Sequence, residues 1–502
     1  MDSSISVNVM MLAKQLLVVA SLLSLTQAQE TVLGVYIFHR HGDRTSKSTP
    51  PTSLTDLGYQ QVWQSGDFYR NRYVDANATS PIFGLASDLV KTSQLSVEAP
   101  VDTVLQNSAV GFLQGLYPPV GATLSTQVLA NGTSVAAPLN GYQLIPVNAV
   151  ASASSGANSE NSAWLQGQSG CHNAIVSSNN YFFSDEYEDK LKSTEGFYSN
   201  LLPVINRTFT AATNTFKNAY TVFDLINVAL IHNTSIQSSD LLTAPTLHQL
   251  QTLADVHEFN LAYNSSEPIR AIAGSTLAAQ IVQHLNATIT GKSQAPIVSL
   301  QFGAYASFLS FFGLAQLPAA SANFTGLVGY ASSMVFELVT NASLSSSSSS
   351  DDTTTTAPYP SADDIAVRFL FANGSAAANP LTAYPLFGRA ETLLPWSTFA
   401  SEMARFAVGD LPTWCTQCGN STGVCAAAAA NTTSGGTPSA SQGAPGEGGM
   451  SRAVVGAIGA MVTLAVVFGI EALVMLVAGL RIVRRERLDA ASAERLAPAV
   501  KA

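Results

Sequence analysis

The length and composition of the chain set the first limits on what it can be. With 502 residues, it is long enough for one large α/β domain or two ordinary domains with a substantial apolar core. Only 11% of the residues are charged, and the formal net charge is −10. Proteins that bind nucleic acids cluster basic residues on one surface, so this balance argues against a nucleic-acid partner.

The N-terminus has the pattern of a secretory signal peptide. Lys14 precedes an apolar run from Leu16 to Leu25, and Thr26-Gln27-Ala28 supplies small residues for cleavage. The run is shorter than the roughly 20 residues that a membrane-spanning helix needs. We therefore expect residues 1–28 to be a signal peptide that is removed after Ala28.

The C-terminus has the pattern of a membrane anchor. Residues 453–480 are almost wholly apolar and are long enough to cross a bilayer as one tilted helix. Four arginines follow within residues 481–487, and the positive-inside rule then makes residues 481–502 a cytoplasmic tail. We expect a single-pass type I protein of the secretory pathway, located at the cell surface or in the vacuole, whose ectodomain covers residues 29–425.

Two stretches of low complexity interrupt the chain. Residues 344–358 contain a serine run and a threonine run, and residues 426–452 are rich in Ala, Thr, Ser and Gly. Such compositions cannot bury enough apolar surface to order themselves. We expect the first stretch to be a surface insertion in the ectodomain and the second to be a disordered stalk.

Glycans offer this weakly charged ectodomain a source of solubility, because its sequence is rich in Asn-X-Ser/Thr sequons that stop before the apolar C-terminal segment. The candidate glycosylation sites are Asn77, Asn131, Asn206, Asn233, Asn264, Asn286, Asn323, Asn341, Asn373, Asn420 and Asn431.

The chain contains four cysteines, Cys171, Cys415, Cys418 and Cys425. In an oxidising compartment we expect them to form two disulfides, and the sequence leaves all three possible pairings open. A zinc or thioredoxin-like role for the C-x-x-C pair is disfavoured, because no histidine lies nearby.

A strand and a helix flank the segment that carries the chemistry. Residues 31–38 form a β-branched and aromatic run that predicts a strand buried on both faces. After a Ser/Thr/Pro loop, Ser53 or Thr55 can cap a helix that presents Leu57, Trp63 and Phe68 at near-helical spacing and continues to about residue 73. The segment between them therefore lies where the carboxyl ends of strands place ligands in α/β sheets.

That segment, His39 to Thr45, sets an imidazole between two guanidinium groups. Arg40 and Arg44 flank His41, and Gly42 permits a tight turn. Guanidinium groups match phosphate oxygens, and a neutral imidazole nitrogen can attack phosphorus, so the pattern predicts phosphoryl transfer through a phosphohistidine. The alternative interpretation is a basic loop that holds a structural carboxylate.

Arg40-His41-Gly42-x-Arg44-Thr45 resembles the signature of the histidine acid phosphatases, the phytase-like branch of the phosphoglycerate mutase-like superfamily. The chain looks like a fungal-type, membrane-anchored member, with the resemblance running from Glu30 to about Cys425. Further blocks resemble those of the family in the same order, at residues 54–60, 107–109, 112–119, 269–274 and 300–303.

The resemblance implies His41 as the nucleophile and Arg40 and Arg44 as phosphate ligands. Two departures from the family pattern stand out. The stretch of residues 101–107, where the family has a third phosphate-binding arginine, has none. Where the family has a His-Asp pair whose aspartate protonates the leaving group, this chain has Ala304-Tyr305, and losing such an acid costs about 10²–10⁴ in rate.

Our first candidate for a substitute acid is Glu98, followed by Asp102 and Tyr305. The remaining histidines lack the spacing of metal ligands, so we expect neither a metal site nor a cofactor. These are His172, His232, His248, His257 and His284.

The resemblance implies an α/β fold with a mostly parallel central sheet, helices on both faces and a smaller helical cap domain, followed by the transmembrane helix. The first functional hypothesis is a membrane-anchored acid phosphatase that hydrolyses phosphomonoesters through a phosphohistidine intermediate. The second is a catalytically impaired or inactive relative with a binding or surface role, which the Ala304-Tyr305 replacement favours.

Overall fold

The computed structural model describes residues 30–150, 170–232, 240–291, 295–344 and 359–422, together with residues 236, 238, 425 and 426. The chain divides into two units, residues 1–434 and 435–502, and every described residue belongs to the first unit. The expected signal peptide, transmembrane helix and cytoplasmic tail lie outside the described residues, as does almost all of the insertion and stalk. None of the helices in the described part is long and apolar enough to span a bilayer.

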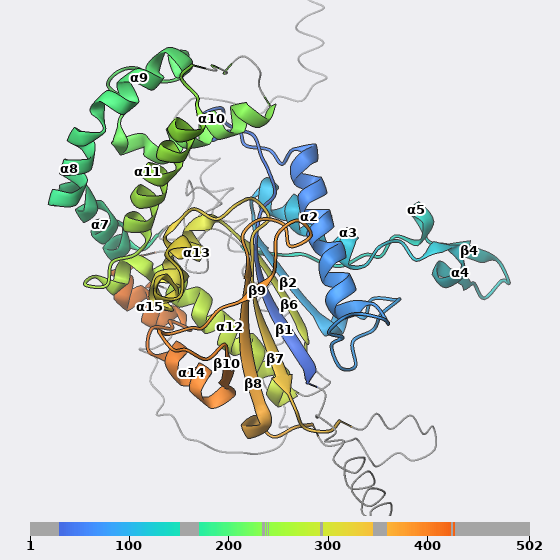
Figure 1. The fold of residues 1–502 in the computed structure, drawn as a ribbon. Coiled ribbons are helices and arrows are strands. Elements are labelled where there is room, and N and C mark those ends of the chain that lie inside the picture. Colours follow the sequence, from blue (N-terminus) through green and yellow to red (C-terminus); the bar gives the residue numbers. More distant parts are fainter. Residues whose placement is uncertain are drawn as a thin grey trace, which may run out of the picture. The chain divides into compact units, whose positions relative to one another are not determined.

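A mixed eight-stranded sheet forms the centre of the described unit (Figure 1). Its order is β10-β8-β7-β1-β6-β2-β5, and β9 pairs with β8. The strands are β1 (Thr31–Arg40), β2 (Leu95–Pro100), β5 (Asn148–Val150), β6 (Val298–Gly303), β7 (Ser333–Thr340), β8 (Ile365–Ala372), β9 (Thr382–Ala383) and β10 (Leu393–Pro395).

The expectation of a mostly parallel sheet is wrong for one half of it. β1, β6, β2 and β5 pair in parallel, whereas β7, β8, β9 and β10 pair antiparallel. The physical reason lies in the connections: helices lie between consecutive parallel strands of the chain, whereas no α-helix lies between β7 and β8 among the described residues, and antiparallel neighbours need no such crossover. The predicted low-complexity insertion lies in the connection between these two strands.

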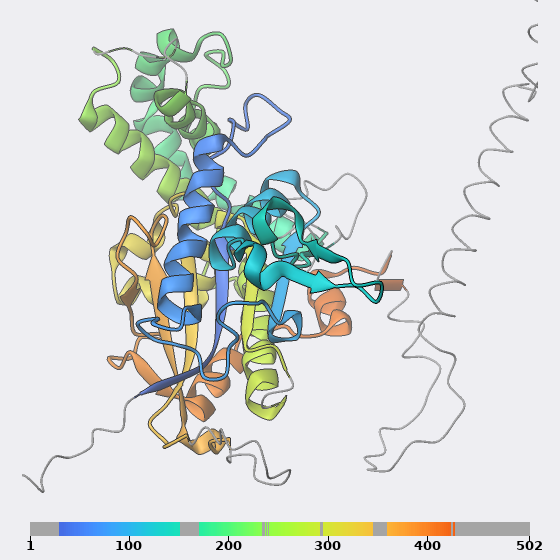
Figure 2. The same ribbon diagram turned by 90° about the vertical axis from the view of Figure 1, so that its right-hand side faces the viewer.

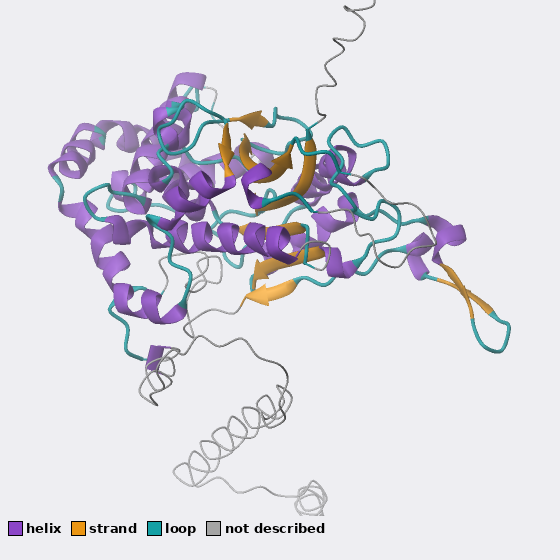
Figure 3. Ribbon diagram, turned by 90° about the horizontal axis from the view of Figure 1, so that it is seen from below, coloured by secondary structure: helices purple, strands orange, loops and turns teal. Residues whose placement is uncertain are grey.

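Helices cover both faces of the sheet (Figure 3). On one face, Val35 and Ile37 of β1 pack with α2 (Asp56–Tyr69) and α3 (Thr103–Leu116). On the other face, Tyr36 and Phe38 pack with α12 (Ile272–Gly291), α13 (Tyr305–Leu314) and α14 (Trp396–Ala404). The alternation follows the two-residue period of a strand and confirms that β1 is buried on both faces.

Helix α2 begins where the sequence predicts, because the Thr55 side chain accepts a hydrogen bond from the Gly58 backbone N–H. Of the three apolar residues at near-helical spacing, Leu57 and Phe68 are half-buried and Trp63 is exposed. Glycines bring α2 and α3 together: a Cβ on Gly66 would lie 1.9 Å from the Phe112 carbonyl oxygen, and one on Gly115 would lie 2.1 Å from that of Trp63. A short π-helix, Arg70–Val74, continues α2 to about the predicted end.

A separate group of helices lies between β5 and β6 in the sequence and has its own apolar cluster. These helices are α7 (His172–Asn180), α8 (Asp185–Ser193), α9 (Glu195–Ile205), α10 (Ala219–His232) and α11 (Ala244–Ala262). Figure 1 shows α10 and α11 beyond the end of the sheet at which the chain leaves β1 for α2. The group fits the smaller helical part that we expected in the middle of the chain, and we call it the helical layer.

The remaining elements lie away from this arrangement. Between α3 and β5, the hairpin of β3 (Thr126–Val128) and β4 (Ser134–Ala136) extends outward together with α4 (Gly121–Ser125) and α5 (Pro138–Gly141) (Figure 2). Helix α15 (Leu411–Cys418) closes the described part.

The four cysteines form two disulfides, as expected, and the structure selects the pairing. Cys171 bonds to Cys418, which ties α7 to α15, and Cys415 bonds to Cys425. The two cysteines of the C-x-x-C pair therefore have different partners.

Most of the sequon asparagines that the structure describes are accessible. Asn264 and Asn420 are half-buried, and Asn233 and Asn431 lie outside the described residues. The exposed ones are Asn77, Asn131, Asn206, Asn286, Asn323, Asn341 and Asn373.

Candidate active site

The predicted motif begins at the carboxyl end of β1. Arg40 is the last residue of the strand and pairs with Gly303 of β6. His41 follows and is buried, and its carbonyl oxygen accepts a hydrogen bond of 2.9 Å from the Ala331 N–H. Gly42 is required here, because a Cβ would lie 2.2 Å from the Gly58 carbonyl oxygen at the start of α2.

The orientation of the His41 ring suits a nucleophile. Its Nδ1 lies 2.8 Å from the Gly42 carbonyl oxygen. A carbonyl oxygen only accepts, so Nδ1 carries the hydrogen, and the neutral ring then has its lone pair on Nε2. The loop backbone therefore selects the tautomer in which Nε2 can attack phosphorus.

Arg40 is held between two aromatic rings. Its Cζ lies 4.7 Å from the ring centre of Tyr330 and 5.6 Å from that of Tyr305, and one guanidinium N–H donates to the Val328 carbonyl oxygen. Stacking orients a guanidinium while leaving its edge available for an oxyanion. Arg40 is therefore a preorganised cation beside His41.

Arg44 is held by the helical layer. One Nη1 hydrogen bond of 2.9 Å joins it to Asp224 of α10 in an ion pair that is buried on both sides, and Nη2 lies 3.1 Å from the Tyr220 hydroxyl. The second Asp224 oxygen accepts from the Ser46 hydroxyl and the Lys47 backbone N–H, each at 2.8 Å. Arg44 thus holds a structural carboxylate, as the alternative interpretation of the motif expected, while remaining next to the site.

Sequence reasoning missed Lys47, which brings a third cation to the loop. Its Nζ lies 5.6 Å from the ring centre of Tyr220 and 5.7 Å from that of Tyr305. The signal for it was a basic residue six positions after His41 in the same loop. Lys47 supplies positive charge to a site that lacks the family's third arginine.

Tyr330 was also missed, because it lies far from the motif in the sequence. Its ring centre is 5.7 Å from that of His41 and 5.9 Å from the Arg44 Cζ. Burial raises the pKa of the Tyr330 hydroxyl, and the charges of Arg44 and Arg40 oppose this shift. The next residue, Ala331, has φ of 59°, a left-handed conformation that is strained for alanine and accompanies the turn that carries Tyr330 to His41.

Tyr305 stands where the resemblance would put the family's acid. β6 ends at Gly303 beside Arg40, so Ala304 and Tyr305 come directly beside the motif. The Tyr305 hydroxyl donates a hydrogen bond of 2.6 Å to Glu258 of α11.

Asp43, the variable residue of the motif, also links the loop to the helical layer. It is fully buried, and one carboxylate oxygen lies 2.5 Å from both the Thr55 hydroxyl and His232 Nε2 at the end of α10. Two carboxylates therefore join the loop to α10. Asp43 of the loop contacts His232 of the helix, and Asp224 of the helix contacts Arg44 of the loop.

Glu98 lies outside this group. It pairs with Gln301, which pairs with Phe38, three residues before His41. With strands 4.8 Å apart and a rise of 3.3 Å per residue, this places Glu98 roughly 10 Å sideways and roughly 10 Å back along the sheet from His41. Its charge instead acts on His284, whose pKa is lowered by burial and partly restored by Glu98.

Asp102 also has a structural position. Its side chain accepts hydrogen bonds from the Val104 and Leu105 N–H groups and caps α3. Among the described residues, no three His, Cys, Asp or Glu side chains are grouped as metal ligands would be.

A cavity of about 300 Å³ adjoins the site. Its charged lining residues are Arg40 and Asp224, and its aromatic ones are Tyr220, Phe223 and Tyr330; the other polar ones are uncharged carboxamides. The helical layer and the loop before β7 form its walls. A small, mostly neutral leaving group fits this chemistry.

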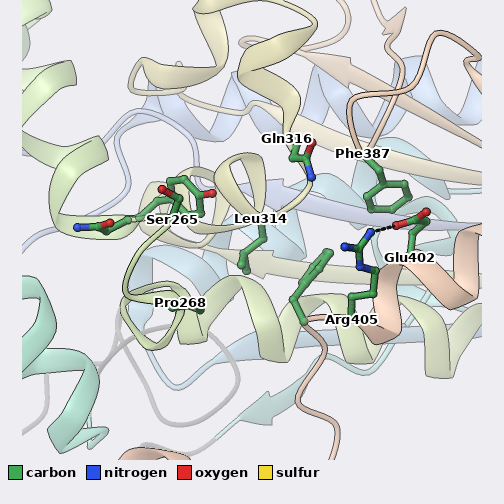
Figure 4. Close-up of a pocket in the computed structure, with 10 residues that line it drawn as sticks. Ser265, Pro268, Leu314, Gln316, Phe387, Glu402 and Arg405 are labelled. Carbon is green, nitrogen blue, oxygen red and sulfur yellow. Dashed lines mark hydrogen bonds and ion pairs between the residues drawn. The ribbon is translucent and has the colours of Figure 1, made fainter.

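A second cavity of about 330 Å³ lies elsewhere, beside α13 and α14 (Figure 4). Its charged groups are Glu402 and Arg405, which form an ion pair of 2.9 Å, and no histidine is among its described lining residues. It lacks a nucleophile of the kind found at His41.

A buried histidine between two arginines, at the carboxyl edge of an α/β sheet, defines a phosphomonoesterase of the histidine acid phosphatase type. The chain belongs to the histidine phosphatase superfamily (branch 2), whose family model matches residues 49–359, more than half of the chain. The matched range begins after Arg44, so Arg40, His41 and Arg44 support the assignment separately.

Solved structures of similar fold include phytases. The Hafnia alvei phytase in complex with tartrate is 14% identical, with 77% of this chain and 98% of that chain covered and a TM-score of 0.46. The phytase from D. castellii is 14% identical, covering 78% and 82% with a TM-score of 0.43. The Bifidobacterium longum multiple inositol polyphosphate phosphatase in complex with phosphate is 12% identical, covering 75% and 92% with a TM-score of 0.43. No curated protein matches the sequence. The function proposed for this chain rests on its own residues and on its family, because structural similarities as distant as these carry no argument.

Proposed function

We propose that this chain is a membrane-anchored acid phosphatase that hydrolyses phosphomonoesters through a phosphohistidine on His41. The observation that carries the proposal is the His41 ring, whose Nδ1 is held by the Gly42 carbonyl oxygen so that Nε2 can attack beside the stacked guanidinium of Arg40. The reaction needs only these side chains and water.

The proposed chemistry has two steps. In the first, Nε2 of His41 forms a bond to phosphorus while the bond from phosphorus to the ester oxygen breaks, and the departing oxygen takes up a proton. In the second, water attacks the phosphohistidine, inorganic phosphate leaves and His41 is restored. Arg40 and Lys47 offset the negative charge of the phosphoryl oxygens in both steps.

The cavity supports a preference for small monoesters. Its one lining cation is Arg40, and Asp224 adds a carboxylate. A substrate with several phosphates needs a broad basic surface, and its additional phosphates would meet aromatic rings and carboxamides here. The activity for which the similar phytases are named is therefore not part of our proposal.

Anchoring and location rest on the sequence. The expected signal peptide of residues 1–28 and the expected span of residues 453–480 predict a type I membrane protein of the secretory pathway, at the cell surface or in the vacuole. Two disulfides and many accessible sequons are in keeping with an oxidising, glycosylating compartment.

The test uses the full chain in detergent, assayed at acid pH with 4-nitrophenyl phosphate. His41→Ala is expected to abolish release of nitrophenol, whereas the matched control His172→Ala, an exposed histidine in α7, leaves it unchanged. Quenching a reaction with radiolabelled substrate in alkaline detergent should trap a base-stable, acid-labile phosphoprotein with the native chain and none with His41→Ala. A wild-type rate equal to that of His41→Ala would refute the proposal.

A second candidate function is binding of phosphate groups without turnover. The observation that favours it is the buried ion pair between Arg44 and Asp224, which gives one of the two motif arginines an internal carboxylate partner. In that case inorganic phosphate binds to the wild-type chain by calorimetry while no ester is hydrolysed.

A further inference from the structure

The site lacks a carboxylic acid where the leaving group needs one, and the structure shows what stands there instead. Tyr305 follows β6 at the position of the family's aspartate, beside the motif. Its side chain is longer than that of aspartate, and its hydroxyl lies 2.6 Å from Glu258 Oε2. The carboxyl group of Glu258, from the helical layer, is therefore present near the site, and the hydroxyl of Tyr305 lies between it and the motif.

Glu258 is itself held in place. Its other oxygen, Oε1, lies 2.8 Å from Nδ1 of His257, which is buried, and the Nε2 of that histidine has no hydrogen-bond partner among the described residues. Tyr305, Glu258 and His257 thus form a continuous chain of hydrogen bonds that begins beside the motif and ends in the interior of the helical layer. Such a chain can store a proton and pass it on.

The phenol lies among the cations of the site. The Arg40 Cζ is 5.6 Å from its ring centre and the Lys47 Nζ is 5.7 Å from it, and the Tyr220 ring packs against it at 4.7 Å between centres. The positive charges of Arg40 and Lys47 therefore stabilise the negative charge that develops on the phenolic oxygen as its proton leaves.

The position of Glu258 agrees with in-line displacement. His41 belongs to the loop at the sheet edge, so the leaving group departs away from the sheet and toward the helical layer. Glu258 is on α11 of that layer, where Gln251, two turns earlier on the same helix, lines the cavity.

The other carboxylates near the motif are poorly suited to donate a proton. Asp224 accepts from Arg44, Ser46 and the Lys47 N–H, a set of donors that stabilises its ionised form. Asp102 caps α3, and Glu98 lies back along the sheet.

We propose that Tyr305 is the proton donor to the leaving group and that Glu258 resupplies its proton. This inference rests on the proposed function. In the reactive state Glu258 is protonated and donates to the phenolic oxygen. As the bond from phosphorus to the ester oxygen breaks, the phenolic proton passes to the departing oxygen and the Glu258 proton passes to the phenolic oxygen. The water that later attacks the phosphohistidine releases one proton to solvent, and Glu258 takes one proton back from solvent, so this second step, which all esters share, does not need Tyr305.

The test compares leaving groups. Tyr305→Phe in the full chain removes the hydroxyl and keeps the ring, so the rate with an alkyl ester, glycerol phosphate, is expected to fall about 100-fold or more. Hydrolysis of 4-nitrophenyl phosphate, whose leaving group departs as an anion, is expected to change by less than about threefold. Glu258→Gln is expected to show the same bias, with a larger loss on glycerol phosphate than on 4-nitrophenyl phosphate.

The matched control is Tyr220→Phe, which removes a neighbouring hydroxyl that lies against Arg44 rather than a carboxyl group. It is expected to alter the two esters equally. Inhibition by inorganic phosphate shows that each variant keeps a folded site. Equal losses on both esters in Tyr305→Phe, or no loss on either, would overturn the inference, whereas a wild type no faster than His41→Ala would overturn the proposed function itself.

Discussion

The Asp255 carboxylate in α11 accepts a hydrogen bond of 2.8 Å from the backbone N–H of Leu327. Leu327 begins the loop that lines the cavity, supplies the Val328 carbonyl oxygen to Arg40 and carries Tyr330 to His41. One carboxylate of the helical layer therefore positions the loop that covers the catalytic histidine.

The burial of Asp255 predicts that its contribution to stability falls as pH rises. Burial raises the pKa of Asp255 from 3.8 to about 6, although the Leu327 hydrogen bond opposes the shift. Between these values the native state binds more protons than the unfolded state, so the free energy of unfolding decreases from pH 4 to pH 6. Asp255→Asn removes this titration, and the stability of the variant relative to the wild type should increase over that interval.

Urea denaturation at pH 4 and pH 7 measures the effect, followed by tryptophan fluorescence. The control is Asp189→Asn at an exposed position of α8, whose difference from the wild type is expected to be the same at both pH values. An Asp255→Asn difference that does not grow with pH would contradict the raised pKa that burial gives Asp255.

A buried ionic cluster joins the edge of α2 to the sheet. Glu337 of β7 is fully buried and accepts hydrogen bonds from Arg72 at 2.8 Å, Tyr73 at 2.6 Å and Arg368 at 3.2 Å. Glu337→Gln leaves Arg72 without its counter-charge, whereas Arg368 keeps Glu30, and the change is expected to lower the free energy of unfolding by about 3 kcal/mol. The surface pairs of Glu402 serve as the comparison, and Glu402→Gln should cost at most about 1 kcal/mol.

The two disulfides should differ in their contributions to stability. Cys171–Cys418 closes a loop with a sequence separation of 247, and Cys415–Cys425 closes one of 10. Chain-entropy arithmetic then assigns about 5 kcal/mol to the first and about 3 kcal/mol to the second. Double serine variants of each pair, compared by urea denaturation, should show the larger loss for Cys171 and Cys418, and equal losses would contradict the entropic explanation.

The surroundings of two helical glycines predict opposite effects of their substitution by alanine, because Gly115 lies where α2 and α3 approach closely and Gly196 faces open space. Gly115→Ala places a Cβ 2.1 Å from the Trp63 carbonyl oxygen, so the helices must separate, and a loss of about 1–3 kcal/mol is expected. Gly196→Ala in α9 meets no neighbouring atom and should stabilise by about 0.5–1 kcal/mol. Thermal unfolding of both variants provides the measurement, and a neutral Gly115→Ala would mean that the helices can move apart freely.

Structural features that depend only on residues close together in the sequence could be predicted from the sequence. The apolar run before Arg40 forms β1, Thr55 caps α2, and Ala304-Tyr305 lie beside the motif. Each depends on strand period, capping chemistry or the end of a strand, which are local properties.

The features that the sequence did not predict depend on contacts between segments that are distant in the sequence. The antiparallel half of the sheet, the disulfide pairing and the placement of Glu98 away from His41 all depend on which segments become neighbours in space. Asp224 and Glu258 meet the site only because the helical layer packs over the sheet edge. The sequence by itself thus determined the nucleophile and the loop that holds it, whereas tertiary packing decided the surroundings of that loop, because charge, burial and proton donors come from residues that local patterns do not bring together.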